Sequence, residues 1–131
     1  MEPIKVIRPL LKANQEIAAE NREVFRKRGL KVLNLLGSPG SGKTTLLEKA
    51  LVLLRDRLRC GVIEGDLETS YDAERISALG VPALQINTGG GCHLDSTMIK
   101  QALASFPLEG MQVLFIENVG NLVCPAGFDL G

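Results

Sequence analysis

The chain has 131 residues, 45% of them hydrophobic and 23% charged, which is typical of about one globular domain and not of a disordered segment. Its 15 basic and 15 acidic residues give a net charge of zero, so nothing indicates a face that binds nucleic acid. No apolar run reaches the roughly 18 residues that cross a membrane, and no signal-peptide pattern begins the chain, so we expect a cytoplasmic protein.

Helices and strands are predicted to alternate along the chain. Apolar pairs seven residues apart predict a helix over residues 10–28 that ends at Gly29, and we favour its packing on its own domain over contact with a partner. The later strands are predicted at residues 31–36, 61–65, 83–87 and 111–117, and the later helices at residues 43–59, 72–79 and 95–105. Near-continuous apolar strands between helices indicate an α/β fold with a mostly parallel sheet and helices on both faces.

Two domain-level expectations follow from this order of elements. Residues 1–30 form an N-terminal helical extension, and residues 31–131 form a nucleotide-binding α/β domain that stops soon after its fourth strand, so we expect it to be incomplete. The helix over residues 43–59 is expected to bury one apolar face, made of Leu46, Leu47, Ala50, Leu51, Leu54 and Leu58.

A phosphate-binding loop is the strongest motif in the chain. The pattern G-x-x-x-x-G-K-[ST] is matched at every fixed position by Gly37, Ser38, Pro39, Gly40, Ser41, Gly42, Lys43 and Thr44. The glycines let backbone N–H groups point at phosphates, and the following helix adds its positive end. Lys43 is expected to reach the β- and γ-phosphates, the Thr44 hydroxyl to bind Mg²⁺, and Thr45 to lie at the nucleotide. A chance glycine turn is a weak alternative, since a strand precedes the loop and a helix follows it.

Acidic residues follow two of the predicted strands. Asp66 and Glu117 lie at the carboxyl ends of predicted parallel strands, where α/β folds bind their ligands. Both are candidates to bind Mg²⁺ or to position water. Gly120 could give its N–H group to a γ-phosphate. Asp72 is a second catalytic candidate, although a helix cap explains it equally well. For each of these acids, the alternative is a solvated loop residue.

A possible transition-metal site combines the only histidine with two of the three cysteines. Cys92 and His93 are adjacent, and Cys124 follows the fourth strand, so the three side chains could meet at one edge of the sheet. Such a set suits Zn²⁺ or Ni²⁺ and lacks one ligand of a tetrahedral site, which water or a second subunit would supply. A capping histidine with two buried thiols is an equally weighted alternative, and Cys60 reads as a core thiol. If the site is real, nucleotide state would set metal affinity through the segment carrying Cys124.

Four stretches stand out in chain order, namely GSPGSGKTTLLEKAL, VIEGDLETSYDAERI, INTGGGCHLDSTMI and LFIENVGNLVCPAGFDLG. Together they resemble the HypB family of SIMIBI-class GTPases that help to load nickel into [NiFe]-hydrogenase. The resemblance implies GTP hydrolysis with Mg²⁺ at Thr44, Asp66 and Glu117. It also implies a metal site at Cys92, His93 and Cys124 near the interface of a nucleotide- or metal-dependent homodimer. The implied partners are a HypA-type nickel chaperone and the hydrogenase large-subunit precursor.

Two departures from the family pattern keep alternatives open. The chain has neither the N-terminal cysteine-rich motif nor the histidine-rich stretch of some family members, so nickel storage is not supported. The guanine-specificity motif N-K-x-D is also absent, so the choice of GTP over ATP rests on the resemblance. The alternatives are a metal-binding module with little turnover and a P-loop ATPase or small-molecule kinase with a structural Cys/His cluster. Zn²⁺ and Ni²⁺ suit the ligands equally well.

Overall fold

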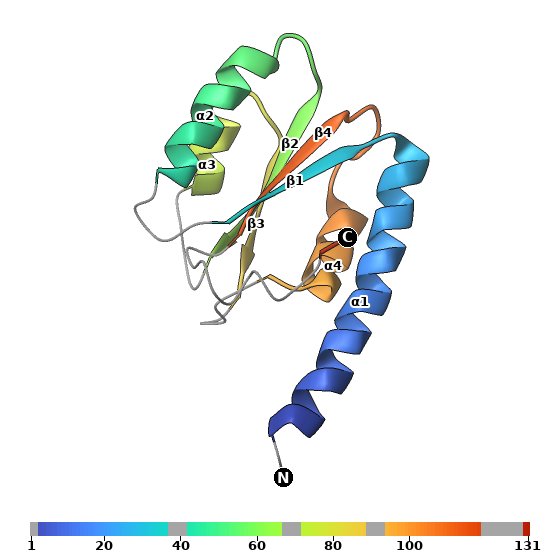
Figure 1. Cartoon of the computed structure of the whole chain (residues 1–131). Helices are drawn as coiled ribbons and strands as arrows, with labels where there is room; N and C mark the ends of the chain where they lie inside the picture. Colours follow the sequence, from blue (N-terminus) through green and yellow to red (C-terminus); the bar gives the residue numbers. More distant parts are fainter. Residues whose placement is uncertain (1–2, 37–41, 67–71, 89–93, 119–129) are drawn as a thin grey trace.

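The computed structural model describes residues 3–36, 42–66, 72–88, 94–118 and 130–131, with backbone only for residues 3–10, 66 and 72. Its elements in chain order are α1 (Pro3–Arg28), β1 (Lys31–Leu35), α2 (Lys43–Leu54), β2 (Cys60–Asp66), α3 (Asp72–Ser77), β3 (Ala83–Asn87), α4 (Ser96–Ser105) and β4 (Val113–Glu117). The four strands form one parallel sheet in the order β1-β4-β2-β3 (Figure 1). The predicted α/β fold is therefore confirmed.

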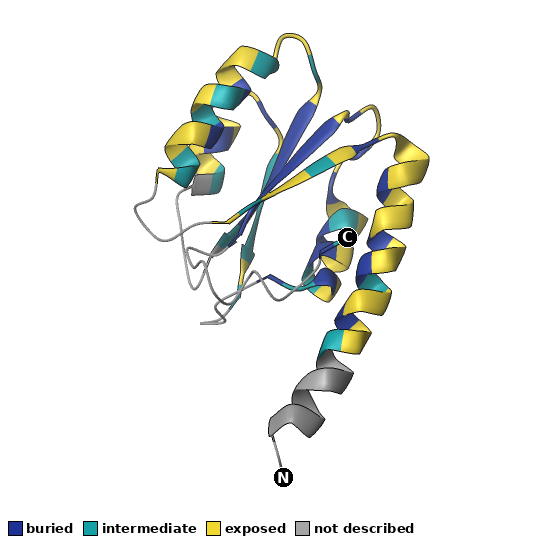
Figure 2. Cartoon of the chain, in the orientation of Figure 1, coloured by how far each residue is buried: buried dark blue, intermediate teal, exposed yellow. Residues whose placement is uncertain are grey.

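Two hydrophobic cores lie on opposite faces of this sheet. On β4, Val113 and Phe115 face α2 and α3, whereas Leu114 and Ile116 face α1 and α4. This alternation follows from the two-residue repeat of a strand, and it explains why β4 is apolar throughout. The central strands β4 and β2 are accordingly the most buried part of the sheet, while β1 forms an exposed edge with Leu33 half exposed (Figure 2).

The prediction for the buried face of α2 was partly wrong. Leu47 and Leu51 are buried as expected, but Leu46 is 65% exposed. Neighbouring residues on a helix point about 100° apart, so Leu46 and Leu47 cannot both face the sheet. The helix also ends at Leu54, earlier than predicted, although the chain continues as a turn that still brings Leu58 against the core.

Helix α1 begins at Pro3, earlier than the predicted start at residue 10, because the apolar pairs that predicted the helix begin only at Leu10. A proline at this position has no helical bond to lose, and the helix ends before Gly29, whose φ of 63° favours glycine. Within the described ranges, none of the helices combines the length and apolar character that a membrane crossing requires.

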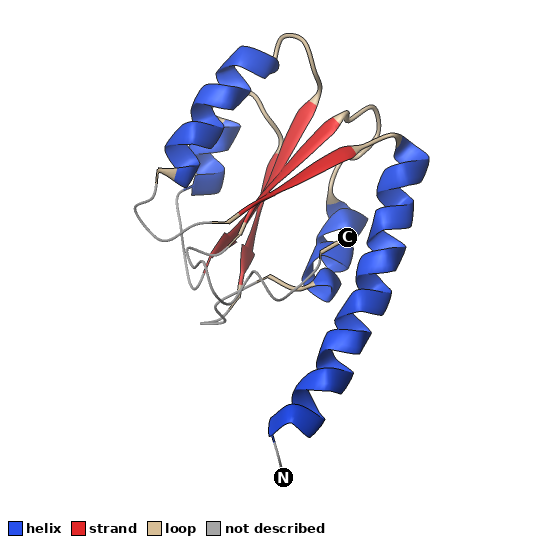
Figure 3. Cartoon of the chain, viewed as in Figure 1, coloured by secondary structure: helices blue, strands red, loops and turns tan. Residues whose placement is uncertain are grey.

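Helix α1 lies alongside α4 (Figure 3), so it packs on its own domain as expected. A buried polar network joins the two helices. Asn14 Oδ1 accepts a bond from the Ser96 backbone N–H at 2.8 Å, and the Ser96 hydroxyl donates to the Asn14 carbonyl at 2.6 Å. Asn21 Nδ2 donates to the carbonyls of Ser96 and Leu130, each at 2.9 Å. The network fixes the first turn of α4 and the residue Leu130 to the N-terminal helix.

The Asn21 side chain should contribute strongly to stability. Asn21→Ala removes both donors to buried carbonyls, and a buried polar group left without its partner costs about 1–3 kcal/mol. We expect urea denaturation to show a loss of about 2–3 kcal/mol in unfolding free energy. The control is Gln15→Ala, which removes an exposed amide from the same helix and should change stability by less than about 0.5 kcal/mol. Equal effects of the two variants would contradict a structural role for the network.

Candidate functional site

The described part of the phosphate loop lies at the carboxyl edge of the sheet. Residues 37–41 lie outside the described ranges, whereas Gly42, Lys43 and Thr44 are described. Gly42 has a φ of 87°, a left-handed conformation that glycine adopts without strain, and α2 begins directly after it. Glycine brings no side-chain oxygen to the first N–H groups of α2, which is the arrangement that suits a phosphate.

The Thr44 hydroxyl donates a short hydrogen bond to Glu117 Oε1. Glu117 is the last residue of β4 and is only 3% exposed, so this contact joins the first turn of α2 to the end of a central strand. The other carboxylate oxygen, Glu117 Oε2, is buried and has no hydrogen-bond partner among the described residues. Buried oxygens of this kind are costly unless they bind a donor or a cation. Thr44 and Glu117 therefore offer the hard oxygen ligands that Mg²⁺ prefers.

Glu64 is a second buried carboxylate at this site, and sequence reasoning missed it. It is 1% exposed and is the register partner of Glu117 in the parallel pair of β2 and β4. Register partners lie about 4.8 Å apart on the same face of a sheet, so two carboxylates stand side by side facing α2. The sequence does contain a signal for this burial. Cys60, Val62 and Glu64 occupy every second position of β2, so Glu64 shares the face of the buried Cys60 and Val62.

The structure places the other predicted nucleotide residues only in part. Asp66 is the last residue of β2 and the register partner of Asn87, so its backbone lies at the same edge as Glu117. Asp72 is the first residue of α3. The side chains of these two aspartates are not described, and Gly120 lies outside the described ranges. Thr45 is exposed in the first turn of α2.

Lys43 contacts the segment that follows β4. Its ammonium group donates to the backbone carbonyl of Asn118 at 2.9 Å. The Asn118 side chain in turn accepts a bond from the Leu94 backbone N–H at 3.0 Å. Asn118 therefore links Lys43, which is expected to reach the β- and γ-phosphates, to Leu94, which lies two residues before α4.

The predicted transition-metal ligands Cys92, His93 and Cys124 lie outside the described ranges. What the structure describes is the position of their neighbours. Leu94, directly after His93, is fully buried and bonded to Asn118, and Ser96 begins α4. Across the residues that the structure does describe, three or more histidine, cysteine or acidic side chains do not gather as a metal site.

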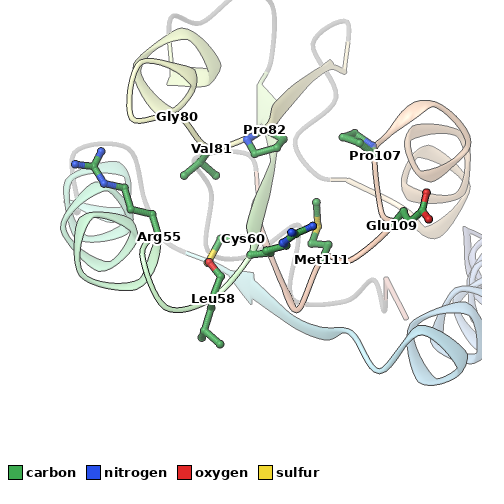
Figure 4. Close-up of a pocket in the computed structure, with 10 residues that line it drawn as sticks. Arg55, Leu58, Cys60, Gly80, Val81, Pro82, Pro107, Glu109 and Met111 are labelled. Carbon is green, nitrogen blue, oxygen red and sulfur yellow. The ribbon is translucent and has the colours of Figure 1, made fainter.

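A pocket of about 350 Å³ lies at the opposite edge of the sheet, near the amino ends of β2 and β3. Figure 4 shows Cys60, Val81, Pro82 and Met111 in its wall, with Arg55 nearby. Cys60 is 6% exposed and burial raises the pKa of its thiol, which disfavours the reactive thiolate. The prediction that Cys60 is a core thiol is thus confirmed, and this pocket is separate from the carboxyl edge.

Comparison with known proteins gives consistent matches. The family described as CobW/HypB/UreG, nucleotide-binding domain, matches residues 31–129. The hydrogenase maturation factors HypB of Escherichia coli (strain K12) and Azotobacter vinelandii are each 57% identical to the chain, over 93% and 98% of it. The chain spans only 42% of the length of either relative. The crystal structure of HypB from Helicobacter pylori in complex with nickel superposes with a TM-score of 0.84 at 49% identity, covering 91% of this chain and 56% of that one.

The buried carboxylate pair should lower stability in the absence of a cation. Glu117→Gln keeps an oxygen that accepts from Thr44 and replaces one of two adjacent buried carboxyl groups by a neutral amide, so we expect the unfolding free energy to rise by about 1 kcal/mol in metal-free buffer. The measurement is thermal or urea denaturation with EDTA present. Glu109→Gln, which neutralises an exposed carboxylate, should change stability by less than about 0.5 kcal/mol. A clear loss of stability in Glu117→Gln would contradict this view of the pair.

Proposed function

Because this chain belongs to the CobW/HypB/UreG nucleotide-binding family, we propose that it is a GTP-binding and GTP-hydrolysing nickel metallochaperone that serves [NiFe]-hydrogenase maturation. The observation that carries the proposal is the contact of Thr44 with the buried Glu117, whose second oxygen lacks a partner among the described residues. Thr44 is the last residue of the phosphate-loop sequence and lies in the first turn of α2, and Glu117 ends β4 beside it, where a nucleotide and its metal ion are expected.

Each residue of the nucleotide site has a proposed task. Lys43 holds the β- and γ-phosphates, and Thr44, Glu117 and Asp66 hold Mg²⁺. When bound, Mg²⁺ supplies charge that neutralises the phosphate oxygens. Asp72, or Asp66, orients the attacking water, because Asp66 ends β2 at its carboxyl edge and Asp72 begins α3, the next element of the chain. The remaining proposed nucleotide contacts are Gly37, Ser38, Pro39, Gly40, Ser41, Gly42, Thr45 and Gly120.

The proposed metal cargo is nickel, held by Cys92, His93 and Cys124. Two thiolates and one imidazole suit Ni²⁺ or Zn²⁺, and the name of the Helicobacter pylori structure states a nickel complex. Release of the cargo is proposed to depend on nucleotide state, since the segments that carry these residues adjoin Leu94 and Asn118 at the nucleotide edge. Nickel affinity and nucleotide affinity then change each other by the same factor.

The proposed partners follow from the family and not from contacts of this chain. They are a second copy of the chain in a nucleotide- or metal-dependent homodimer, a HypA-type nickel chaperone, and the hydrogenase large-subunit precursor. The matched relatives carry the name hydrogenase maturation factor, and one from Helicobacter hepaticus is named a hydrogenase/urease maturation factor. A cytoplasmic location is proposed with these partners.

The catalytic proposal is tested by Lys43→Ala. Removal of one preorganised charge on the phosphates should lower the rate of phosphate release from GTP by about 100-fold or more. Lys49→Ala removes an exposed lysine from the same helix and should leave the rate within about twofold. Circular dichroism and nickel titration of both variants check that folding and cargo binding survive. An unchanged rate of GTP hydrolysis in Lys43→Ala would contradict the proposed GTPase activity of this site.

A further inference from the structure

Asn118 connects three parts of the fold that meet at the carboxyl edge. It is 1% exposed and follows the last residue of β4. Its backbone N–H donates to the Leu35 carbonyl at 3.0 Å, and its Nδ2 donates to Asn34 Oδ1 at 3.3 Å, so β1 holds it from one side. Its backbone carbonyl accepts from Lys43 Nζ at 2.9 Å, and its Oδ1 accepts from the Leu94 N–H at 3.0 Å.

We propose that Asn118 is a positioning residue that transmits nucleotide binding at Lys43 to the chain segment ending at Leu94. The proposal rests on the proposed function, because it names the residue through which nucleotide state acts on the metal-carrying segment. Asn118 is not proposed to contact the reacting phosphate or the metal ion. It acts through the two partners that its carbonyl and its side chain bind.

The first step of this transmission is competition for Lys43. A triphosphate with its negative charge attracts the Lys43 ammonium far more strongly than a neutral carbonyl does, which favours movement of the ammonium toward the phosphates. When Lys43 turns to the phosphates, the carbonyl of Asn118 loses a charged donor. Asn118 is buried, so the loss of this donor changes the forces on its peptide group.

The second step is the rigid contact between Asn118 and Leu94. The Leu94 side chain is fully buried, and it packs so closely on β2 that a Cβ atom at Gly65 would lie 2.8 Å from Leu94 Cγ. Leu94 therefore has no room to absorb a shift of the Asn118 amide by rotating its side chain. A change at Asn118 is passed to the Leu94 backbone instead.

The third step is the direction of the change. Ser96, at the start of α4, is held by Asn14 and Asn21 from α1 through buried hydrogen bonds. Asp95 also caps the helix by accepting from the Met98 N–H at 2.9 Å. The helical side of Leu94 is thus fixed, so a change at Asn118 acts on the backbone of Leu94 itself.

The test is a measurement of coupling. Ni²⁺ is titrated into the chain with and without GTPγS and Mg²⁺, and the ratio of the two nickel dissociation constants is compared between variants. Coupled sites typically give ratios of about 5–150, which we expect for the unaltered chain. Asn118→Ala should bring the ratio below about 2, while nickel alone and nucleotide alone each bind within about threefold of normal.

Gln112→Ala is the matched control, because it also removes an amide oxygen that accepts a backbone N–H bond, here from Arg59 at 3.0 Å. It lies near the opposite end of β4 and should keep the full ratio. A normal ratio in Asn118→Ala would overturn the role of Asn118 and leave the proposed function intact. A ratio of one in the unaltered chain would instead overturn nucleotide-coupled release itself, and the transmission with it.

A second measurement decides the case if Asn118→Ala fails to fold. Hydrogen exchange at the Leu94 amide reports its bond to Asn118 directly in the unaltered chain. Binding of GTPγS and Mg²⁺ should speed exchange at Leu94 by about tenfold and leave the Arg59 amide, bonded to Gln112, unchanged. Equal protection of Leu94 with and without nucleotide would contradict the proposal.

Discussion

The buried contact between Thr44 and Glu117 is the interaction on which the rest of this account depends. It joins the first turn of α2 to the end of β4 through two residues that are 73 positions apart in the chain. Parallel strands make this contact possible, because β1, β2 and β4 all end at the same edge of the sheet. The phosphate loop leaves β1 at that edge and Glu117 ends β4 there, so the fold brings a nucleotide loop to a carboxylate without any long-range motif in the sequence.

Each face of the sheet carries a buried polar cluster, and the two clusters differ in how fully their atoms are hydrogen-bonded. Between α1 and α4, Asn14, Asn21 and Ser96 bond to one another and to backbone, so this network costs little and fixes a helix in place. Next to α2, Glu64 and Glu117 are buried side by side, and Glu117 Oε2 has no partner among the described residues. The first arrangement is structural, whereas in the second the buried Glu117 Oε2 is unfavourable until it binds a cation or a donor.

Much of the fold could be predicted because its signals are local. The bounds of β3, the stop at Gly29 and the start of α4 within one residue of the predicted position all follow from apolar runs and punctuating residues. The exposure of Leu46 and the burial of Glu64 could not be predicted as easily, because each depends on which face of an element meets the sheet. Asn118 was missed for a related reason, since its contacts join residues from β1, α2 and the segment before α4. The predicted roles of Cys92, His93 and Cys124 stay predictions.

Magnesium dependence of nucleotide binding tests the central claim most directly. GTPγS is titrated into the chain by calorimetry with Mg²⁺ and with EDTA, and the same is done for Thr44→Val, which replaces the hydroxyl by a methyl group of similar size. If Thr44 and Glu117 form a magnesium site, Mg²⁺ tightens GTPγS binding by about tenfold or more in the unaltered chain and by less than about twofold in the variant. Equal GTPγS affinity with Mg²⁺ and with EDTA in the unaltered chain would contradict the account.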